Sequence, residues 1–420
     1  MSILNIIVTQ VLGSPVIVLG IIGLIGLITL KKSGSEILLG TTKVMMGYTI
    51  LMGGATLIVV ALDPLTKMIR AGLGVQGVIP LYWPAFAATM AKFGTQVALI
   101  FIAGFIINII LCRLTKLHFL ALTVHLQLFW AGFIVVALNA VHISGWEMYL
   151  IGAIICGLYY WLVTAISFHY MKGEMRQPFA NFVPSIMGVI VAAICGKIVG
   201  KGKSAEDIAL PESLDWIKDT IVSITVVFFV FNILFALVAG LPYVNSISGG
   251  TYWLVFLFSS SLSFGASVAI ILYGVRMLLA EIIPALNGIA ERLLPNAIMG
   301  LDYPTIYPLA GTAVMFGFFF HLLGSIVATG IMAATHFSPI VVPGVQINFF
   351  EGALVGVYAN FMGGLKNVIL SCFIVGFLLQ YGVAFVFPHT GMLMPVGYAY
   401  EAFDFNTIGL VIVKVLSLFH

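Results

Sequence analysis

Long apolar segments, each followed by a short polar one, run along almost the whole chain. A helix needs about 20 mostly apolar residues to cross a bilayer, and segments of this kind predict spans at 9–30, 38–62, 94–112, 119–141, 147–168, 219–240, 254–279, 311–333, 341–361, 367–387 and 405–419. The first segment has neither a basic start nor a small-residue cleavage site, so we expect a span rather than a cleaved signal. The pattern predicts an all-α polytopic membrane protein with about eleven transmembrane helices, the last of them short.

Basic residues are concentrated in every second loop. Short cytoplasmic loops of membrane proteins collect lysine and arginine. The loops after the first, third and fifth spans fit that rule, with Lys31, Lys32, Arg113, Lys116, Lys172 and Arg176. The loops after the second and fourth spans are poorer in positive charge. This distribution predicts an N-terminus outside the cell and a C-terminus in the cytoplasm.

The composition mainly excludes other classes of protein. Apolar residues make up 61% of the 420 residues and charged residues 8%, against about 25% charged residues in a soluble domain. The net charge of +3 is too small to indicate nucleic-acid binding. The four cysteines lie apart in apolar segments, and the sequence contains no phosphate loop, zinc-protease motif or cluster of metal ligands. We therefore expect no catalytic residue, metal or cofactor.

The two halves of the chain repeat a set of landmarks at a spacing of 220 residues. Of the 18 basic and 15 acidic residues, nine lie between positions 197 and 219, which predicts a cytoplasmic connector (201–218) between halves 1–200 and 219–420. Repeat one (about 38–135) and repeat two (about 258–355) share glycines and prolines, residues that mark close approaches and breaks. The pairs are Gly54 and Gly274, Pro64 and Pro284, Gly104 and Gly324, and Gly132 and Gly352. With the topology above, the two repeats are inverted, as in many secondary carriers.

Each repeat contains a proline-interrupted apolar piece that is too short to cross the membrane. The first is 77–90, with Tyr82, Trp83 and Pro84, and the second is 299–309, with Asp302. Such pieces at corresponding places point to the binding site of a carrier. Irregular backbone at membrane depth is tolerated only where it is buried in protein or lines a cavity. We expect two re-entrant hairpins that enclose a substrate site.

Ionisable residues inside apolar segments are further candidates, because a charge in the membrane is costly and usually functional. Asp302 would accept hydrogen bonds from substrate hydroxyls, cap the re-entrant piece, or do both. His125 can donate and accept at once, so it would bind substrate or bond within the helix bundle. Four more residues would line the pathway or join helices, and the sequence does not decide between these roles: Gln346, Asn348, Glu351 and Asn360.

Short runs of residues scattered along nearly the full length are together more specific than any single motif. They are Leu30-Lys31-Lys32-Ser33, Gly274-Val275-Arg276-Met277, Ala280-Glu281, Asn287-Gly288-Ile289, Arg292-Leu293, Asp302, Ile306-Tyr307, Pro343-Gly344, Phe349-Phe350, Gly356-Val357-Tyr358-Ala359-Asn360 and Gly363-Gly364. With these runs, the chain resembles the ascorbate-specific enzyme IIC of the bacterial phosphotransferase system (PTS), in the ascorbate/galactitol superfamily of membrane permeases.

The resemblance implies a homodimer whose chains each have a core domain and a V-shaped dimerisation domain. The core would carry the substrate across the bacterial inner (plasma) membrane by an elevator-like shift. Cytoplasmic IIA and IIB proteins would be the partners, and IIB would phosphorylate the sugar. No residue of this chain would then take part in phosphoryl transfer, and no nucleic acid would be bound.

The substrate positions of that family match this sequence unevenly. The histidine and the aspartate are retained as His125 and Asp302, whereas apolar residues replace a glutamine and a His-Gln pair. A buried site built for hydroxyls penalises unmatched ones, so a different polyol or a pentose-like substrate is an alternative to ascorbate. The substrate-binding residues expected from the resemblance are Tyr82, Trp83, His125, Gln127, Phe129, Val183, Pro184 and Asp302.

Two other functions stay open on the sequence alone. In the first, the chain is an ion-coupled secondary carrier of the same fold, without phosphorylation. Alternatively, it would be a membrane receptor that binds its ligand without transporting it.

Overall fold

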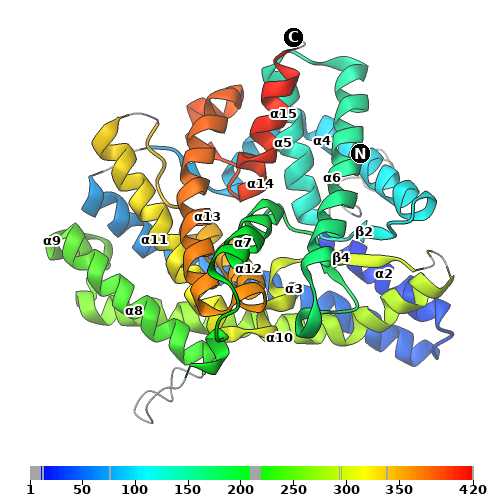
Figure 1. The fold of residues 1–420 in the computed structure, drawn as a ribbon, viewed down its shortest axis with the longest axis horizontal. Helices are drawn as coiled ribbons and strands as arrows, with labels where there is room; N and C mark the ends of the chain where they lie inside the picture. The colour runs from blue at the N-terminus through cyan, green and yellow to red at the C-terminus, as the bar shows by residue number, and fades with distance from the viewer. Residues whose placement is uncertain are drawn as a thin grey trace.

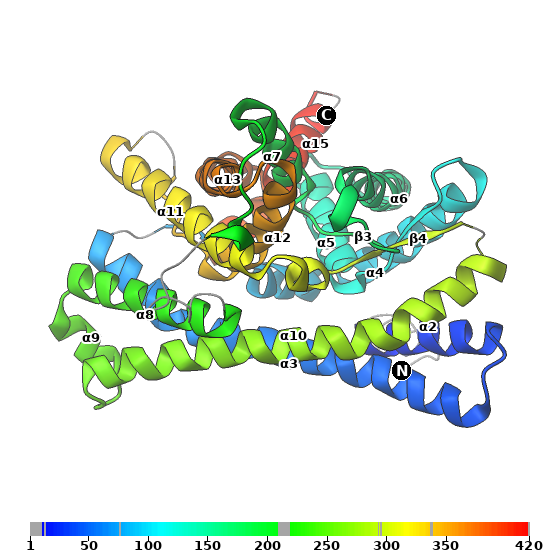
Figure 2. The ribbon, with the colours of Figure 1, turned by 60° about the horizontal axis from the view of Figure 1, so that its bottom comes forward.

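Two helices of 40 residues each, α3 (Gly34–Leu73) and α10 (Trp253–Arg292), pack against each other along one side of the molecule (Figure 2). The computed structural model describes residues 11, 14–74, 77–208, 219–292, 294, 296–336 and 339–418. A helix of this length is about 60 Å long, roughly twice the thickness of the hydrocarbon core, so neither helix fits upright within it. α2 (Pro15–Thr29) packs on both of them. α8 (Thr220–Ala239) does the same, and the chain bends by 114° from α8 into α9 (Leu241–Ile247).

The predicted spans 38–62 and 254–279 end shortly before Pro64 and Pro284, whereas both helices continue through these prolines. A proline inside a membrane helix is tolerated where neighbouring helices and side chains satisfy the freed backbone groups.

The remaining helices form two groups on the other side of the long pair (Figures 1 and 2). One group contains α4 (Tyr82–Leu114), α5 (Val124–Ala140) and α6 (Gly145–Tyr170), and the other contains α11 (Gly311–Thr335), α12 (Val345–Gly363) and α13 (Leu365–Val386). α7 (Ile186–Val199), which the span prediction missed, packs on α12 and α13. The short helices α14 (Phe403–Asn406) and α15 (Ile408–Leu416) complete this part.

Both predicted broken pieces consist of a short strand followed by an interrupted helix. β1 (Ile79–Pro80) leads into α4, which kinks at Phe93 (φ −126°, ψ 24°). β4 (Ile298–Leu301) leads into a 3₁₀ helix, η5 (Tyr303–Leu309), and Ala310 (φ −157°) separates η5 from α11. Phe93 lies three residues beyond the predicted piece 77–90 and Ala310 one residue beyond 299–309, and long apolar helices follow both interruptions.

Short parallel strand pairs hold these pieces in place. β1 pairs with β5 (Tyr398–Ala399), and β4 lies between β2 (Phe119–Ala121) and β3 (Ala180–Asn181). Val78 adds a bridge to Val341. Because lipid offers no hydrogen-bond partners, these pairings satisfy backbone groups that the interrupted helices leave open.

The order of elements recurs along the chain at about the spacing seen in the sequence. The first half contains, in this order, α3, β1, α4, α5, α6, β3 and α7. About 220 residues later, the second half contains α10, β4, η5 with α11, α12, α13, β5 and α15 in the corresponding order. The correspondence extends beyond the predicted limits of 38–135 and 258–355. We propose that the chain arose by duplication and that the two halves meet at the connector.

The described part of the connector is bound to the second half. Asn360 Oδ1 accepts a hydrogen bond from the backbone N–H of Ala205 (2.7 Å), and the carboxylate of Glu206 accepts from the N–H groups of Thr312 and Ala313 at the start of α11. Residues 209–218 of the predicted connector lie outside the described residues. Asn360 thus joins segments of the protein, which is one of the two roles expected for it.

The fold class expected from the sequence is confirmed: this is an all-α polytopic membrane protein. Six helices in the described ranges are long and apolar enough to cross a membrane, or seven if the bent α8–α9 pair forms one span. Further predicted spans correspond to shorter or less apolar helices, such as α5 at 119–141 and α12 at 341–361. These two helices begin inside the molecule, after extended segments.

Replacing Gly317 by alanine tests the packing of α11 against α12. A Cβ atom at Gly317 would collide with the backbone carbonyl of Gly352, whereas one at Gly330 on the same helix meets no atom within 4 Å. Gly317→Ala should therefore lower the free energy of unfolding by about 1–3 kcal/mol. Gly330→Ala should leave it unchanged or raise it by up to about 1 kcal/mol. Thermal unfolding in detergent measures both, and equal midpoints would contradict the tight helix contact.

Candidate substrate site

A cavity of about 220 Å³ lies between α3 and the starts of the interrupted segments. The α3 wall is mostly apolar and includes Leu51, Met52 and Val60. The other walls come from α4, α5, η5, α12 and the segment after β5. The cavity therefore lies between the long helix and the part of the molecule that holds both broken pieces.

Four helices begin at this cavity. Tyr82 is the first residue of α4, Tyr303 the first of η5, His125 the second of α5 and Gln346 the second of α12, and all four residues line the cavity. The first turn of a helix has N–H groups without helical partners and carries partial positive charge. Helix starts at mid-membrane are the usual surroundings of a transported substrate.

His125 and Asp302 form a polar pair in this cavity. His125 Nε2 lies 3.4 Å from Asp302 Oδ2, and each side chain is 13% exposed. The hydroxyl of Tyr48 on α3 lies 3.0 Å from His125 Nδ1 and fixes the ring from the other side. Asp302 Oδ1 accepts a hydrogen bond from the N–H of Tyr303 (2.7 Å) and so caps η5. One oxygen of Asp302 thus acts as the expected cap, and the other faces His125 and the cavity.

Asn181 holds the second broken piece in position. Its side-chain amide donates to the backbone carbonyl of Asp302 (3.2 Å) and to Thr305 Oγ1 (2.9 Å). Its own Oδ1 accepts from the hydroxyl of Tyr358 (3.1 Å). Ser185 bonds the hydroxyl of Tyr303 (2.7 Å). These bonds fix the backbone around Asp302, so the carboxylate has little freedom to move away from the cavity.

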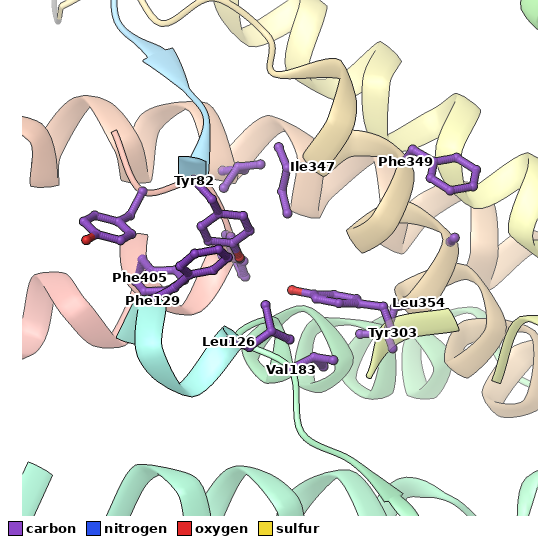
Figure 3. Packing of buried hydrophobic residues seen from close by; sticks show 14 of the residues in the cluster. Tyr82, Leu126, Phe129, Val183, Tyr303, Ile347, Phe349, Leu354 and Phe405 are labelled. Carbon is purple, nitrogen blue, oxygen red and sulfur yellow. The ribbon is translucent and has the colours of Figure 1, made fainter. Parts of the chain in front are cut away.

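Aromatic rings form the wall beside the polar pair. Tyr82 stacks on Phe129 with ring centroids 4.8 Å apart, and His125 meets the same Phe129 ring edge-on. Figure 3 shows Tyr82 and Phe129 beside Phe405, with the ring of Tyr303 lying toward them. Tyr82 and Phe129, both expected among the substrate-binding residues, thus line the cavity.

Three further predicted site residues do not line the cavity. Gln127 and Val183 are fully buried behind it, and Val183 lies next to Leu126 and Tyr303 (Figure 3). Pro184 is buried too, and its carbonyl accepts from the N–H of Asp404 (2.9 Å). The side chain of Trp83 lies outside the described part of the chain, although its backbone belongs to α4.

The polar residues of α12 divide between the expected roles. Gln346 lines the cavity. Asn348 joins helices, because its Oδ1 meets His321 Nδ1 (2.6 Å) and the hydroxyl of Ser325 (2.7 Å). Glu351 is fully buried, with its Oε2 3.9 Å from His321 Nε2. Spacing along one helix could not separate these roles.

Glu401 was missed by the sequence reasoning. It is fully buried, lines the cavity and stands two residues after the end of β5. It stands between two predicted spans, 367–387 and 405–419, so the cost of a charge inside a span did not single it out. The pairing of β5 with β1 brings this residue to membrane depth.

Comparison with known proteins supports the family resemblance. Residues 10–404 match the family described as "PTS system sugar-specific permease component". The "Ascorbate-specific PTS system EIIC component" of Mycoplasma pneumoniae is 27% identical over 448 aligned positions. The match covers 93% of this chain and 66% of that relative, slightly less than two thirds of its length. Since the family match spans nearly all of the sequence, the chain belongs to the PTS sugar-specific permease component family.

Proposed function

We propose that this protein is the IIC permease of a phosphotransferase system and moves a small hydroxylated substrate, ascorbate or a related sugar or polyol. A separate IIB protein would phosphorylate the substrate. The observation that carries this proposal is the His125–Asp302 pair at converging helix starts in a cavity of about 220 Å³. A buried site of this kind binds hydroxyl groups, because they can both donate and accept. The family membership supports the phosphorylation coupling.

We also propose that transport occurs by an elevator-type movement in a homodimer. The cavity has one wall on the long helix α3 and the others on the part that holds both broken pieces. A shift of that part along α3 would carry the substrate with it, since His125 and Asp302 both belong to the moving side. The long α3–α10 pair would stay fixed and provide the dimer contact.

An ion-coupled carrier of the same fold is the second candidate. Buried carboxylates without partners are favoured positions for a coupling proton. Glu351 and Glu401 are fully buried, and neither of their carboxyl groups has a hydrogen-bond partner among the described residues. The uptake experiment below separates this candidate from the IIC proposal.

Uptake of labelled ascorbate, galactitol and pentitols tests the coupling. Cells that lack their own permeases for these compounds should accumulate one of them as its phosphate when they carry this protein together with the phosphotransferase proteins. Without those proteins, accumulation should be lost, because the chain has no phosphoryl donor of its own. Uptake of the unmodified compound that follows a proton or sodium gradient would contradict the proposal and support the ion-coupled carrier.

Asp302→Asn tests the polar pair without removing the cap of η5. Asparagine can still accept the N–H of Tyr303, but the charge facing His125 is lost. A hydrogen bond to a charged group is worth about 1.5–3 kcal/mol, so affinity should fall about tenfold or more. The double variant His125→Ala/Asp302→Ala should lose binding altogether. If the double variant bound the substrate with unchanged affinity in an equilibrium binding experiment, the assignment of this site would be wrong.

The proposed orientation can be checked by labelling single cysteines with a membrane-impermeant maleimide. All four native cysteines are buried and should give little background. Trp146 and Lys172 are exposed and lie at opposite ends of α6. Trp146→Cys should react in intact cells, and Lys172→Cys only after permeabilisation, because the N-terminus is proposed to lie outside. The reverse labelling pattern would invert the topology.

A further inference from the structure

Three unsatisfied polar groups face the cavity beside the His125–Asp302 pair. Both carboxyl oxygens of Glu401, the hydroxyl of Tyr82 and Oε1 of Gln346 are buried, and none makes a hydrogen bond of good geometry with the described residues. The hydroxyl of Tyr82 faces the side chain of Tyr303. All three side chains line the cavity. A buried polar group without a partner costs free energy, more so when it is charged. Such a group next to a cavity indicates that a ligand supplies the missing partner.

The fold brings Glu401 and Tyr82 together from distant parts of the chain. Ile79 and Pro80 pair with Tyr398 and Ala399 in parallel register, and the N–H of Leu81 donates to the carbonyl of Ala399 (2.9 Å). Tyr82 and Glu401 therefore each stand two residues after the end of one of the paired strands. The backbone N–H of Tyr82 faces the Glu401 carboxyl without making a hydrogen bond of good geometry. The two residues thus stand on a strand pair different from the one that carries Asp302.

Comparison with two other buried carboxyl groups shows that Glu401 differs from a structural residue. Asp404 is fully buried, but its Oδ2 accepts from the hydroxyl of Tyr159 (2.7 Å), and its Oδ1 from the N–H of Met187 (2.8 Å) at the start of α7. Asp404 is therefore satisfied within the protein. Glu351 has no hydrogen-bond partner but does not line the cavity. Glu401 alone among these three both lacks a hydrogen-bond partner of good geometry and lines the cavity.

We propose that Glu401 is a further substrate-binding residue, which accepts hydrogen bonds from hydroxyl groups of a small polyhydroxylated compound, with Tyr82 and Gln346 beside it. The inference rests on the proposed transport of a hydroxylated substrate, and it names a contact that determines which substrate the protein selects. Asp302 and Glu401 would then engage different hydroxyls of the same molecule.

The chemistry of the cavity favours this class of ligand. A carboxylate and an amide oxygen only accept hydrogen bonds, and the described lining residues include no lysine or arginine that could donate to them. The hydroxyl of Tyr82 makes no hydrogen bond of good geometry with either acceptor, so a ligand would supply the donors. A polyol or sugar carries several hydroxyls on neighbouring carbons, so it can satisfy Glu401, Gln346 and Asp302 at once. The apolar α3 wall and the Tyr82–Phe129 stack cover its carbon skeleton.

The test compares Glu401→Gln with Glu351→Gln in purified protein. Binding of galactitol, xylitol and ascorbate to the unaltered protein is measured by calorimetry. The compound that binds most tightly is then titrated into each variant. Glu401→Gln should weaken binding of this compound about tenfold or more, because the carboxyl group proposed to accept hydrogen bonds from its hydroxyls is lost. Glu351→Gln, which removes an equally buried carboxyl away from the cavity, should change affinity by less than about threefold.

A thermal unfolding measurement without ligand separates binding from folding. Glu401→Gln should unfold at the same or a higher temperature than the unaltered protein, because it removes a buried carboxyl group that has no hydrogen-bond partner among the described residues. Weaker binding together with a lower unfolding temperature would indicate a structural role and overturn the proposal. Equal affinities of the two variants would also overturn the proposal. Failure of all three compounds to bind the unaltered protein would overturn it too.

The proposed function and this inference fail in different ways. If binding depends on Glu401 but the substrate is never accumulated as its phosphate, the IIC proposal is wrong and the binding role of Glu401 stands. If the substrate is accumulated as its phosphate with the same KM in Glu401→Gln as in the unaltered protein, the IIC proposal stands and the role of Glu401 is wrong.

Discussion

The structure depends on one constraint, which is that lipid supplies no hydrogen bonds to the backbone. A continuous helix meets that constraint alone, but a substrate site at membrane depth requires helices that start and stop there. The chain resolves the conflict with short parallel strands. β1 pairs with β5, and β4 pairs with β2 and β3, so the extended residues before α4 and η5 keep partners away from lipid. The interrupted segments are thus held in place by strands from other parts of the chain.

The same arrangement creates the chemistry of the cavity. Each interruption exposes the first turn of a helix, and Tyr82, His125, Tyr303 and Gln346 all stand in such first turns. Asp302 follows one strand pair and Glu401 the other. The irregular backbone and the polar site therefore have a common origin. A variant that restored continuous helices would remove the site together with the interruptions.

The sequence predicted the fold class and both broken pieces, because hydropathy and proline position are local signals. It also placed His125, Asp302, Tyr82 and Phe129 at the cavity. It failed where tertiary contacts decide the outcome. Pro64 and Pro284 lie within continuous helices, since packing of α3 on α10 outweighs the local tendency to break. Val183 and Pro184 lie behind the cavity wall, and Glu401 reaches the cavity only through the β1–β5 pairing, which no periodicity in the sequence encodes.

Buried polar groups without hydrogen-bond partners also explain why such a cavity can be selective for its substrate. When the cavity is empty, buried acceptors such as Glu401 lack donors, and a ligand that supplies them gains their full hydrogen-bonding energy. A compound of similar size without hydroxyls in the matching places leaves those groups unpaired in a dry environment, where the penalty is largest. Apolar and aromatic side chains form most of the cavity wall, which leaves few positions at which the protein can bond a hydroxyl. Each acceptor that remains then contributes more to the choice of substrate.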